Sequence, residues 1–219
     1  MQLVAFDLDG TLVDTLPDLS DSLNAALERM GFPALSISRV ASILGHGAKE
    51  FCLNALPEDR KDCFDNLLHL FLQHYRQNCC SLSIPYPGIP ALLSKLKNNG
   101  ILLAVISNKP DWETVSIIHS LFGSDTFHYI SGKKDHMALK PDPAAMQSAL
   151  NALHVPASKA VFIGDSEVDI EFACRSGMPC ISVDWGYRTR DQLISAGGNP
   201  IVSNASELES ALIANGFFK

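Results

Sequence analysis

The chain has 219 residues, of which 47% are hydrophobic, and a net charge of −7 that arises from 24 acidic and 17 basic residues. This composition excludes a disordered polypeptide and suffices for one large domain or two modest ones with a substantial core. The basic residues form no stripe, which argues against nucleic acid as a partner, and no apolar run approaches the roughly 20 residues that span a membrane.

The cysteines and the first residues give an expectation about the compartment. None of the six cysteines lies in a C-x-x-C pair, so we expect reduced thiols and no structural zinc site. A redox role for the adjacent Cys79 and Cys80 stays open. The first residues lack the basic and apolar regions of a secretory signal, and we therefore expect a cytoplasmic protein.

The first predicted element is a buried strand at residues 3–7. From about residue 15 to residue 85 the periodicity is helical only, with apolar stripes from Leu16 to Met30 and from Leu67 to Tyr75. We interpret this stretch as an all-α domain inserted after the first strand. Its two neighbouring crossing points would form a hinge for a lid.

From residue 86 onward, strand and helix patterns alternate, which is typical of a parallel sheet with helices on both faces. We expect strands at residues 101–107, 128–131, 160–164, 180–183 and 201–202. Apolar residues at helical spacing predict helices at residues 89–97, 112–121, 143–153, 168–176 and 206–214. The predicted fold class is α/β, a doubly wound parallel sheet core of residues 1–14 and 86–219 with an inserted helical cap domain of residues 15–85.

Two pairs of acidic residues follow predicted strands. Asp7 and Asp9 follow the first strand, and Asp165 and Asp169 follow the strand at residues 160–164. Carboxylates this close together repel each other unless a cation or a shared proton lies between them. Open α/β sheets place ligands at the carboxyl ends of their strands, and Mg²⁺ prefers carboxylate oxygens. The sequence therefore predicts a Mg²⁺ site at this edge of the sheet.

Two further stretches supply what an anion needs. Ser107 and the backbone N–H of Asn108 follow another predicted strand and can donate hydrogen bonds to a phosphoryl oxygen. Lys140 lies between a predicted strand and a helix, where it can supply a compact positive charge. Together with the acidic pairs, these residues predict a site that handles a phosphate group.

The four stretches resemble motifs I to IV of the haloacid dehalogenase superfamily, in its phosphatase branch. The matching patterns are D-x-D-G-T from Asp7, S-N at Ser107, K-P at Lys140 and G-D-S-x-x-D from Gly164 to Asp169. The resemblance extends over essentially the whole chain, because the helical stretch resembles the C1-type cap of that superfamily. It implies a Rossmann-like core with this cap inserted after motif I.

By position, the resemblance implies an aspartyl-phosphate mechanism. Asp7 resembles the nucleophile, and Asp9 resembles the general acid that protonates the leaving oxygen and then activates water. Mg²⁺ would be held by Asp7, by the backbone carbonyl of Asp9 and by Asp165. Asp169 would orient a metal-bound water or Lys140. The phosphoryl oxygens would be held by Ser107, Asn108 and Lys140.

Within the superfamily the chain most resembles phosphoglycolate phosphatases, which implies a small phosphorylated metabolite as partner, with 2-phosphoglycolate first. The stretches that carry this resemblance are Gly45-His46-Gly47-Ala48, Ser107-Asn108-Lys109-Pro110, Lys140-Pro141-Asp142-Pro143 and Trp185-Gly186-Tyr187. The backbone N–H groups of Gly45 and Gly47 would approach the substrate carboxylate closely. His46 either binds that carboxylate or is a solvated loop residue, and Lys109 is expected at the rim.

Several alternatives stay open. A phosphomutase of the β-phosphoglucomutase type shares this cap and both motif I aspartates, although such enzymes usually carry Val where this chain has Thr11. A pyrophosphatase is a closer competitor. A dehalogenase is disfavoured because Asp9 is present, and a non-catalytic regulator is disfavoured because every catalytic position is filled. The protein is either a monomer or a homodimer.

Overall fold

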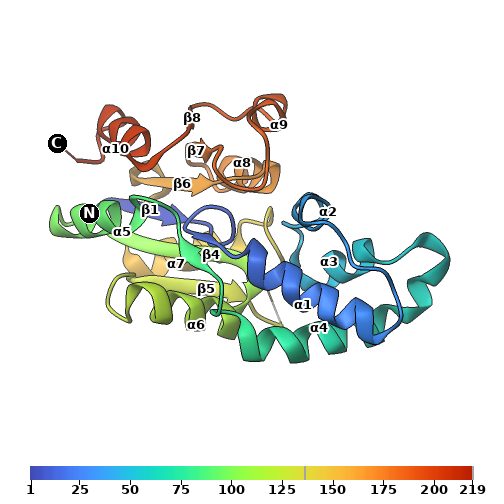
Figure 1. Cartoon of the computed structure of the whole chain (residues 1–219). Coiled ribbons are helices and arrows are strands. Elements are labelled where there is room, and N and C mark those ends of the chain that lie inside the picture. The colour runs from blue at the N-terminus through green and yellow to red at the C-terminus, as the bar shows by residue number, and fades with distance from the viewer. Residues whose placement is uncertain (136, 219) are drawn as a thin grey trace.

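The computed structural model describes residues 1–135 and 137–218. Within these ranges, strands and helices alternate through most of the chain, and a run of helices follows the first two strands (Figure 1). In chain order the elements are β1 (Leu3–Phe6), β2 (Val13–Asp14), α1 (Leu16–Arg29), α2 (Ile37–Ser42), α3 (Gly47–Ala55), η1 (Glu58–Cys63), α4 (Phe64–Asn78), β3 (Ile84–Pro85), α5 (Ile89–Asn98), β4 (Leu102–Pro110), α6 (Asp111–Phe122), β5 (Tyr129–Lys133), α7 (Ala144–Leu153), η2 (Ala157–Lys159), β6 (Ala160–Gly164), α8 (Glu167–Arg175), β7 (Cys180–Val183), α9 (Arg190–Ser195), β8 (Ile201–Val202) and α10 (Ala205–Ala214).

The larger sheet of the described residues has six strands in the order β5-β4-β1-β6-β7-β8. Every pairing in it is parallel, and β1 lies between β4 and β6, with Leu3 opposite both Leu102 and Ala160. The strand order changes direction at β1, so the carboxyl ends of β1, β4 and β6 meet where such sheets bind ligands. This topology confirms the predicted doubly wound α/β core.

Both faces of the sheet are buried, which explains why its strands are continuous apolar runs in the sequence. Leu3 and Ala5 of β1 belong to the apolar cluster that includes residues of α7 and α8. Val4 and Phe6, which point to the opposite face, belong to the cluster that includes residues of α5 and α10. All four side chains are fully buried, so β1 is the centre of the core that fixes the residues after it.

The inserted helices α1, α2, α3 and α4 lie beyond the carboxyl ends of the strands (Figure 1). Helices α1 and α4 pack against each other, and apolar residues of both continue the cluster on one face of the sheet. The chain leaves the sheet at β2 and returns at β3, and these two short strands pair antiparallel, with Val13 opposite Pro85. None of the described helices has the length and apolar character needed to cross a membrane.

Some elements differ from the sequence-based expectation. The strand expected to end at residue 107 continues to Pro110 as β4, with a register shift against β5 between Ile106 and Pro110. Lys109 therefore lies on a buried strand end. The short helices α2, α3 and α9 were not predicted individually, because six to nine residues give too few helical turns for a clear apolar stripe.

A buried carboxylate braces the return of the chain to the sheet. Asp18 in the first turn of α1 accepts hydrogen bonds from the backbone N–H groups of Leu82 and Ser83, at 2.9 and 2.8 Å, and from the Ser83 hydroxyl at 2.5 Å. Asp18 is 1% exposed. The carboxylate of Asp18 therefore joins the start of α1 to the segment at Leu82 and Ser83, through which the chain returns to the sheet.

Replacing Asp18 with Ala is expected to lower the free energy of unfolding by about 3 kcal/mol, because buried donors lose a charged acceptor and no water replaces it. Urea denaturation monitored by circular dichroism measures this loss. Asp21→Ala is the matched control, since Asp21 lies on the exposed side of the same helix. Equal stability of the two variants would contradict the bracing role.

Candidate active site

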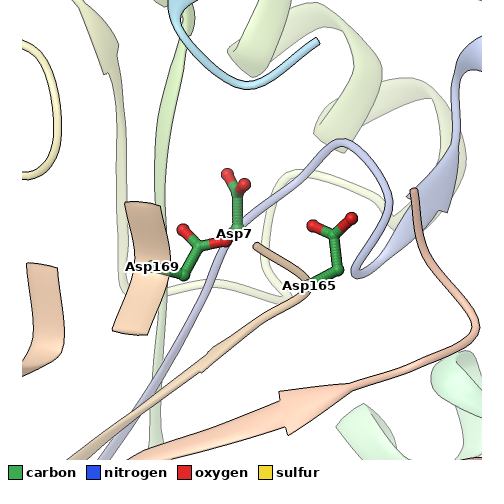
Figure 2. A group of neighbouring side chains, drawn as sticks. All are labelled: Asp7, Asp165 and Asp169. Atoms are coloured by element: carbon green, nitrogen blue, oxygen red, sulfur yellow. The ribbon is translucent and has the colours of Figure 1, made fainter. Parts of the chain in front are cut away.

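Three carboxylates converge at the carboxyl ends of β1 and β6. Asp7 follows β1, Asp165 follows β6, and Asp169 lies in the first turn of α8. Figure 2 shows Asp7 between the other two, and one oxygen from each residue lies within 4.8 Å of the others. The sequence motifs that are more than 150 residues apart therefore meet at one point, as the parallel topology requires.

Two glycines allow the backbone to pack closely around Asp165. A Cβ at Gly10 would lie 2.4 Å from Asp165 Oδ2, and a Cβ at Gly186 would lie 2.4 Å from the Asp165 side chain. Gly10 also has a φ of +81°, which side chains disfavour. The Thr11 hydroxyl donates to Asp165 Oδ1 at 3.2 Å and the backbone N–H of Tyr187 donates to Oδ2 at 2.8 Å, so the carboxylate is held in place.

Burial and mutual repulsion make the ionised acids unfavourable. Burial, together with the charges of Asp169 and Asp9, raises the pKa of Asp7 to about 7 against the lowering effect of Lys140. Burial, Asp169 and Asp7 raise the pKa of Asp165 well above its ordinary value. When ionised, the three acids and Lys140 leave two uncompensated negative charges. A hard divalent cation such as Mg²⁺ fits this set of oxygen donors and this charge.

Lys140 is held between two of these acids. Its ammonium group lies 2.9 Å from Asp7 Oδ1 and donates to Asp169 Oδ1 at 2.7 Å. Burial opposes the charge, but Asp169 and Asp7 outweigh it and raise the pKa of Lys140. The other oxygen of Asp169 accepts from the backbone and hydroxyl of Ser166, at 3.1 and 2.7 Å. Of the two predicted tasks for Asp169, the geometry corresponds to orienting Lys140.

Asp9 is held by Thr15, which precedes α1, and by Lys109 on β4. Its Oδ1 accepts from the Thr15 hydroxyl at 2.5 Å, and Lys109 donates to Oδ1 and Oδ2 at 3.0 and 3.1 Å. The Lys109 side chain is only 3% exposed and lies over the Tyr75 ring of α4. The expected position of Lys109 at the rim is therefore wrong, because β4 carries the residue into the interior.

Ser107 and Asn108 lie near the carboxyl end of β4. Both residues line the site cavity. The Asn108 amide accepts from the backbone N–H of Lys140 at 2.7 Å and donates to the carbonyls of Lys140 and Gly45, both at 3.1 Å. Its side chain thus joins motif III to the inserted helical segment, and the predicted contact of Asn108 with a phosphoryl oxygen is by its backbone N–H.

A cavity of about 60 Å³ lies beside Asp7, Asp9 and Asp165, which is space for a small ligand or several waters. Its lining residues come from the sheet ends and from the helical segment, and they include Asp7, Asp9, Ser107, Asn108, Lys109, Glu113, Asp165, Arg188, Gly45, Gly47, Phe51 and Phe71. His46 is exposed and lines a different hollow on the surface. The structure thus brings Gly45 and Gly47 to the cavity and leaves His46 outside it.

Arg188 connects the helical segment to motif IV and was not found from the sequence. Its guanidinium donates to Glu167 at 2.8 and 3.2 Å, and to the carbonyls of Leu44 and Ala41 at 2.8 and 3.4 Å. Arg188 and Tyr187 come after β7 and carry no acidic or glycine-rich pattern of their own. The stretch Trp185-Gly186-Tyr187 was the available signal, and it pointed to a family rather than to these contacts.

Comparisons with known proteins agree with this geometry. Residues 4–183 match the family described as haloacid dehalogenase-like hydrolase. A phosphoglycolate phosphatase from Mesorhizobium japonicum is 34% identical over 192 residues, which cover 86% of this chain and 85% of the relative. One from Yersinia pestis is 32% identical over 213 residues, which cover 95% and 92%.

A solved structure supports the same conclusion. The crystal structure of a candidate phosphoglycolate phosphatase from Lactobacillus delbrueckii subsp. bulgaricus superposes with a TM-score of 0.89 at 31% identity, covering 97% of this chain and 99% of that one. The four motifs, the parallel sheet and the acidic cluster all agree with the family match. The chain belongs to the haloacid dehalogenase-like hydrolases.

Proposed function

We propose that this hydrolase is a Mg²⁺-dependent phosphatase that cleaves a small phosphate monoester, with 2-phosphoglycolate as its substrate, through an aspartyl-phosphate intermediate. The observation that carries the proposal is the convergence of Asp7, Asp165 and Asp169, with the Lys140 ammonium paired to Asp7 and Asp169. The identity of 34% with a phosphoglycolate phosphatase over most of both chains supports the choice of substrate.

In the proposed reaction, the Asp7 carboxylate attacks phosphorus and the ester P–O bond breaks. Asp9 gives a proton to the leaving oxygen, and later takes one from the water that hydrolyses the aspartyl-phosphate. Lys140, the Ser107 hydroxyl and the Asn108 backbone N–H would stabilise the negative charge spread over the phosphoryl oxygens.

Mg²⁺ would be held by Asp7, by the backbone carbonyl of Asp9 and by Asp165, and it would supply positive charge for the phosphoryl group. The charge on the described side chains supports this role. Two negative charges stay uncompensated when the three acids of Figure 2 are ionised beside Lys140. Without a cation, a phosphate dianion would meet a negative site and be repelled.

We also propose that residues 1–14 and 86–219 form the catalytic core, and residues 15–85 a cap that closes over the substrate. The hydrogen bonds of Asn108 with Gly45, and of Arg188 with Leu44, support a closed arrangement. Phe51 and Phe71 of the helical segment line the cavity, and apolar walls that exclude bulk water strengthen the electrostatic interactions with the phosphoryl group.

A turnover screen tests the proposal. Phosphate release would be measured with 2-phosphoglycolate, pyrophosphate and β-glucose 1-phosphate, with Mg²⁺ and after chelation. We expect hydrolysis of 2-phosphoglycolate that EDTA abolishes and added Mg²⁺ restores. An isomerised sugar phosphate without phosphate release would favour the mutase alternative. Faster cleavage of pyrophosphate would favour the pyrophosphatase.

A further inference from the structure

The cavity contains one carboxyl group that the proposed chemistry does not use. Glu113 lies in the first turn of α6, lines the cavity and is 2% exposed. Within residues 1–135 and 137–218, nothing is within hydrogen-bond distance of its Oε1. A buried polar atom without a partner costs stability, so it needs an explanation such as a missing ligand.

The other charged groups of the lining are already paired. Lys109 donates to both oxygens of Asp9, and Arg188 donates to Glu167 and to two backbone carbonyls. These contacts leave Glu113 as the lining carboxyl whose hydrogen-bonding capacity is not met by the described residues. It is therefore the group best suited to contact the part of a substrate that lies away from the phosphate.

The surroundings of Glu113 disfavour its charged form. The titratable groups that act on it are Lys109 on β4, Asp9 after β1, and Tyr75, Arg76 and Cys79 at the end of α4. Burial raises the pKa of Glu113 to about 7, against the lowering effect of Lys109. The Lys109 charge is shared with Asp9, so it compensates an ionised Glu113 only in part.

We propose that Glu113 determines substrate specificity by donating a hydrogen bond, as a neutral carboxylic acid, to the carboxylate of the leaving group. This inference rests on the proposed function, because it takes 2-phosphoglycolate as the substrate. A substrate carboxylate beside an ionised Glu113 would be repelled, whereas a shared proton converts the repulsion into a charge-assisted hydrogen bond. Buried carboxylic acids that stay neutral to donate such bonds are known in other enzymes.

The test pairs two variants with two substrates. Glu113→Gln keeps a hydrogen-bond donor without charge, and Glu113→Ala removes it. Ethyl phosphate matches 2-phosphoglycolate but lacks the carboxylate. We expect the alanine variant to raise KM for 2-phosphoglycolate by about 10- to 100-fold, the usual effect of losing a hydrogen bond to a charged group. Its KM for ethyl phosphate, kcat for both esters and circular dichroism should stay close to wild type.

The glutamine variant and the pH profile separate a donor from an acceptor. We expect Glu113→Gln to keep a near-wild-type KM for 2-phosphoglycolate, because the amide still donates. The wild-type KM for this ester should rise above pH about 7, as Glu113 ionises, while the glutamine variant should lack that rise. At each pH, the ratio of KM for 2-phosphoglycolate to KM for ethyl phosphate removes the effects of pH that act on the phosphate group of both esters.

Each contrary result has a distinct meaning. An equal rise of KM in both variants would overturn the donor role, and an unchanged ratio in both would overturn any contact with the carboxylate. Wild-type hydrolysis of ethyl phosphate but not of 2-phosphoglycolate would overturn the proposed substrate, and the role of Glu113 with it. Absence of Mg²⁺-dependent hydrolysis of either ester would overturn the proposed function itself.

Discussion

Asp7→Asn is expected to abolish turnover, with a loss of roughly 10⁴-fold or more, because the amide is too weak a nucleophile to attack phosphorus. The same change removes a ligand from the acidic cluster and weakens the partner that Lys140 has at 2.9 Å. Phosphate release from 2-phosphoglycolate at saturating Mg²⁺ measures the effect. Mass spectrometry of rapidly quenched wild-type protein should detect phosphate on the peptide that contains Asp7.

Asp14→Asn is the matched control for this experiment. Asp14 lies on β2, close to Asp7 in the sequence, and its carboxylate accepts a backbone hydrogen bond from Leu16 that an amide oxygen can also accept. We expect this variant to retain most of the wild-type activity. Comparable turnover in Asp7→Asn and wild type would remove Asp7 from the proposed mechanism.

Asp9→Asn is expected to lower kcat for 2-phosphoglycolate by roughly 10²-fold or more, the usual contribution of a general acid and base. The loss should be much smaller with p-nitrophenyl phosphate, as long as formation of the intermediate limits the rate. Its leaving phenolate needs no proton, whereas an alkoxide does. Stopped-flow or steady-state assays with both esters provide the comparison.

The contacts of Asp9 require a second variant as control. Asn at this position would leave the buried Lys109 ammonium without its ion-pair partner, so a general loss of structure is an alternative cause. Thr15→Val removes the other contact of Asp9 and leaves its carboxylate in place. A similar fractional loss with both esters in Asp9→Asn would indicate structural damage rather than a missing acid.

The core of the fold could be predicted from the sequence because its strands are buried on both faces. Such strands form continuous apolar runs, and the run before Asp7 corresponds closely to β1. The helices α2 and α3 could not be placed, since each is short and buries only a few residues. The extension of β4 to Pro110 depends on pairing with β5, which local sequence does not specify.

The acidic residues of the site were predictable for a reason of topology. Parallel strands carry their carboxyl ends to one edge, so motifs after β1 and β6 had to meet once the sheet was assigned. The partners of those residues were harder to predict, because Lys109 and Arg188 act through contacts between segments that are far apart in the chain. His46 lies beside two cavity-lining glycines, yet the turn of the backbone directs it outward. The catalytic roles themselves stay predictions.

The contacts of Arg188 with the helical segment end on main-chain oxygens of Ala41 and Leu44 rather than on side chains. Every residue type offers that oxygen, so substitutions at these two positions can accumulate without loss of the acceptor. The contact therefore tolerates sequence drift in the helical segment but depends on the side chain of Arg188. Natural variants that diverge at these positions should retain the arginine.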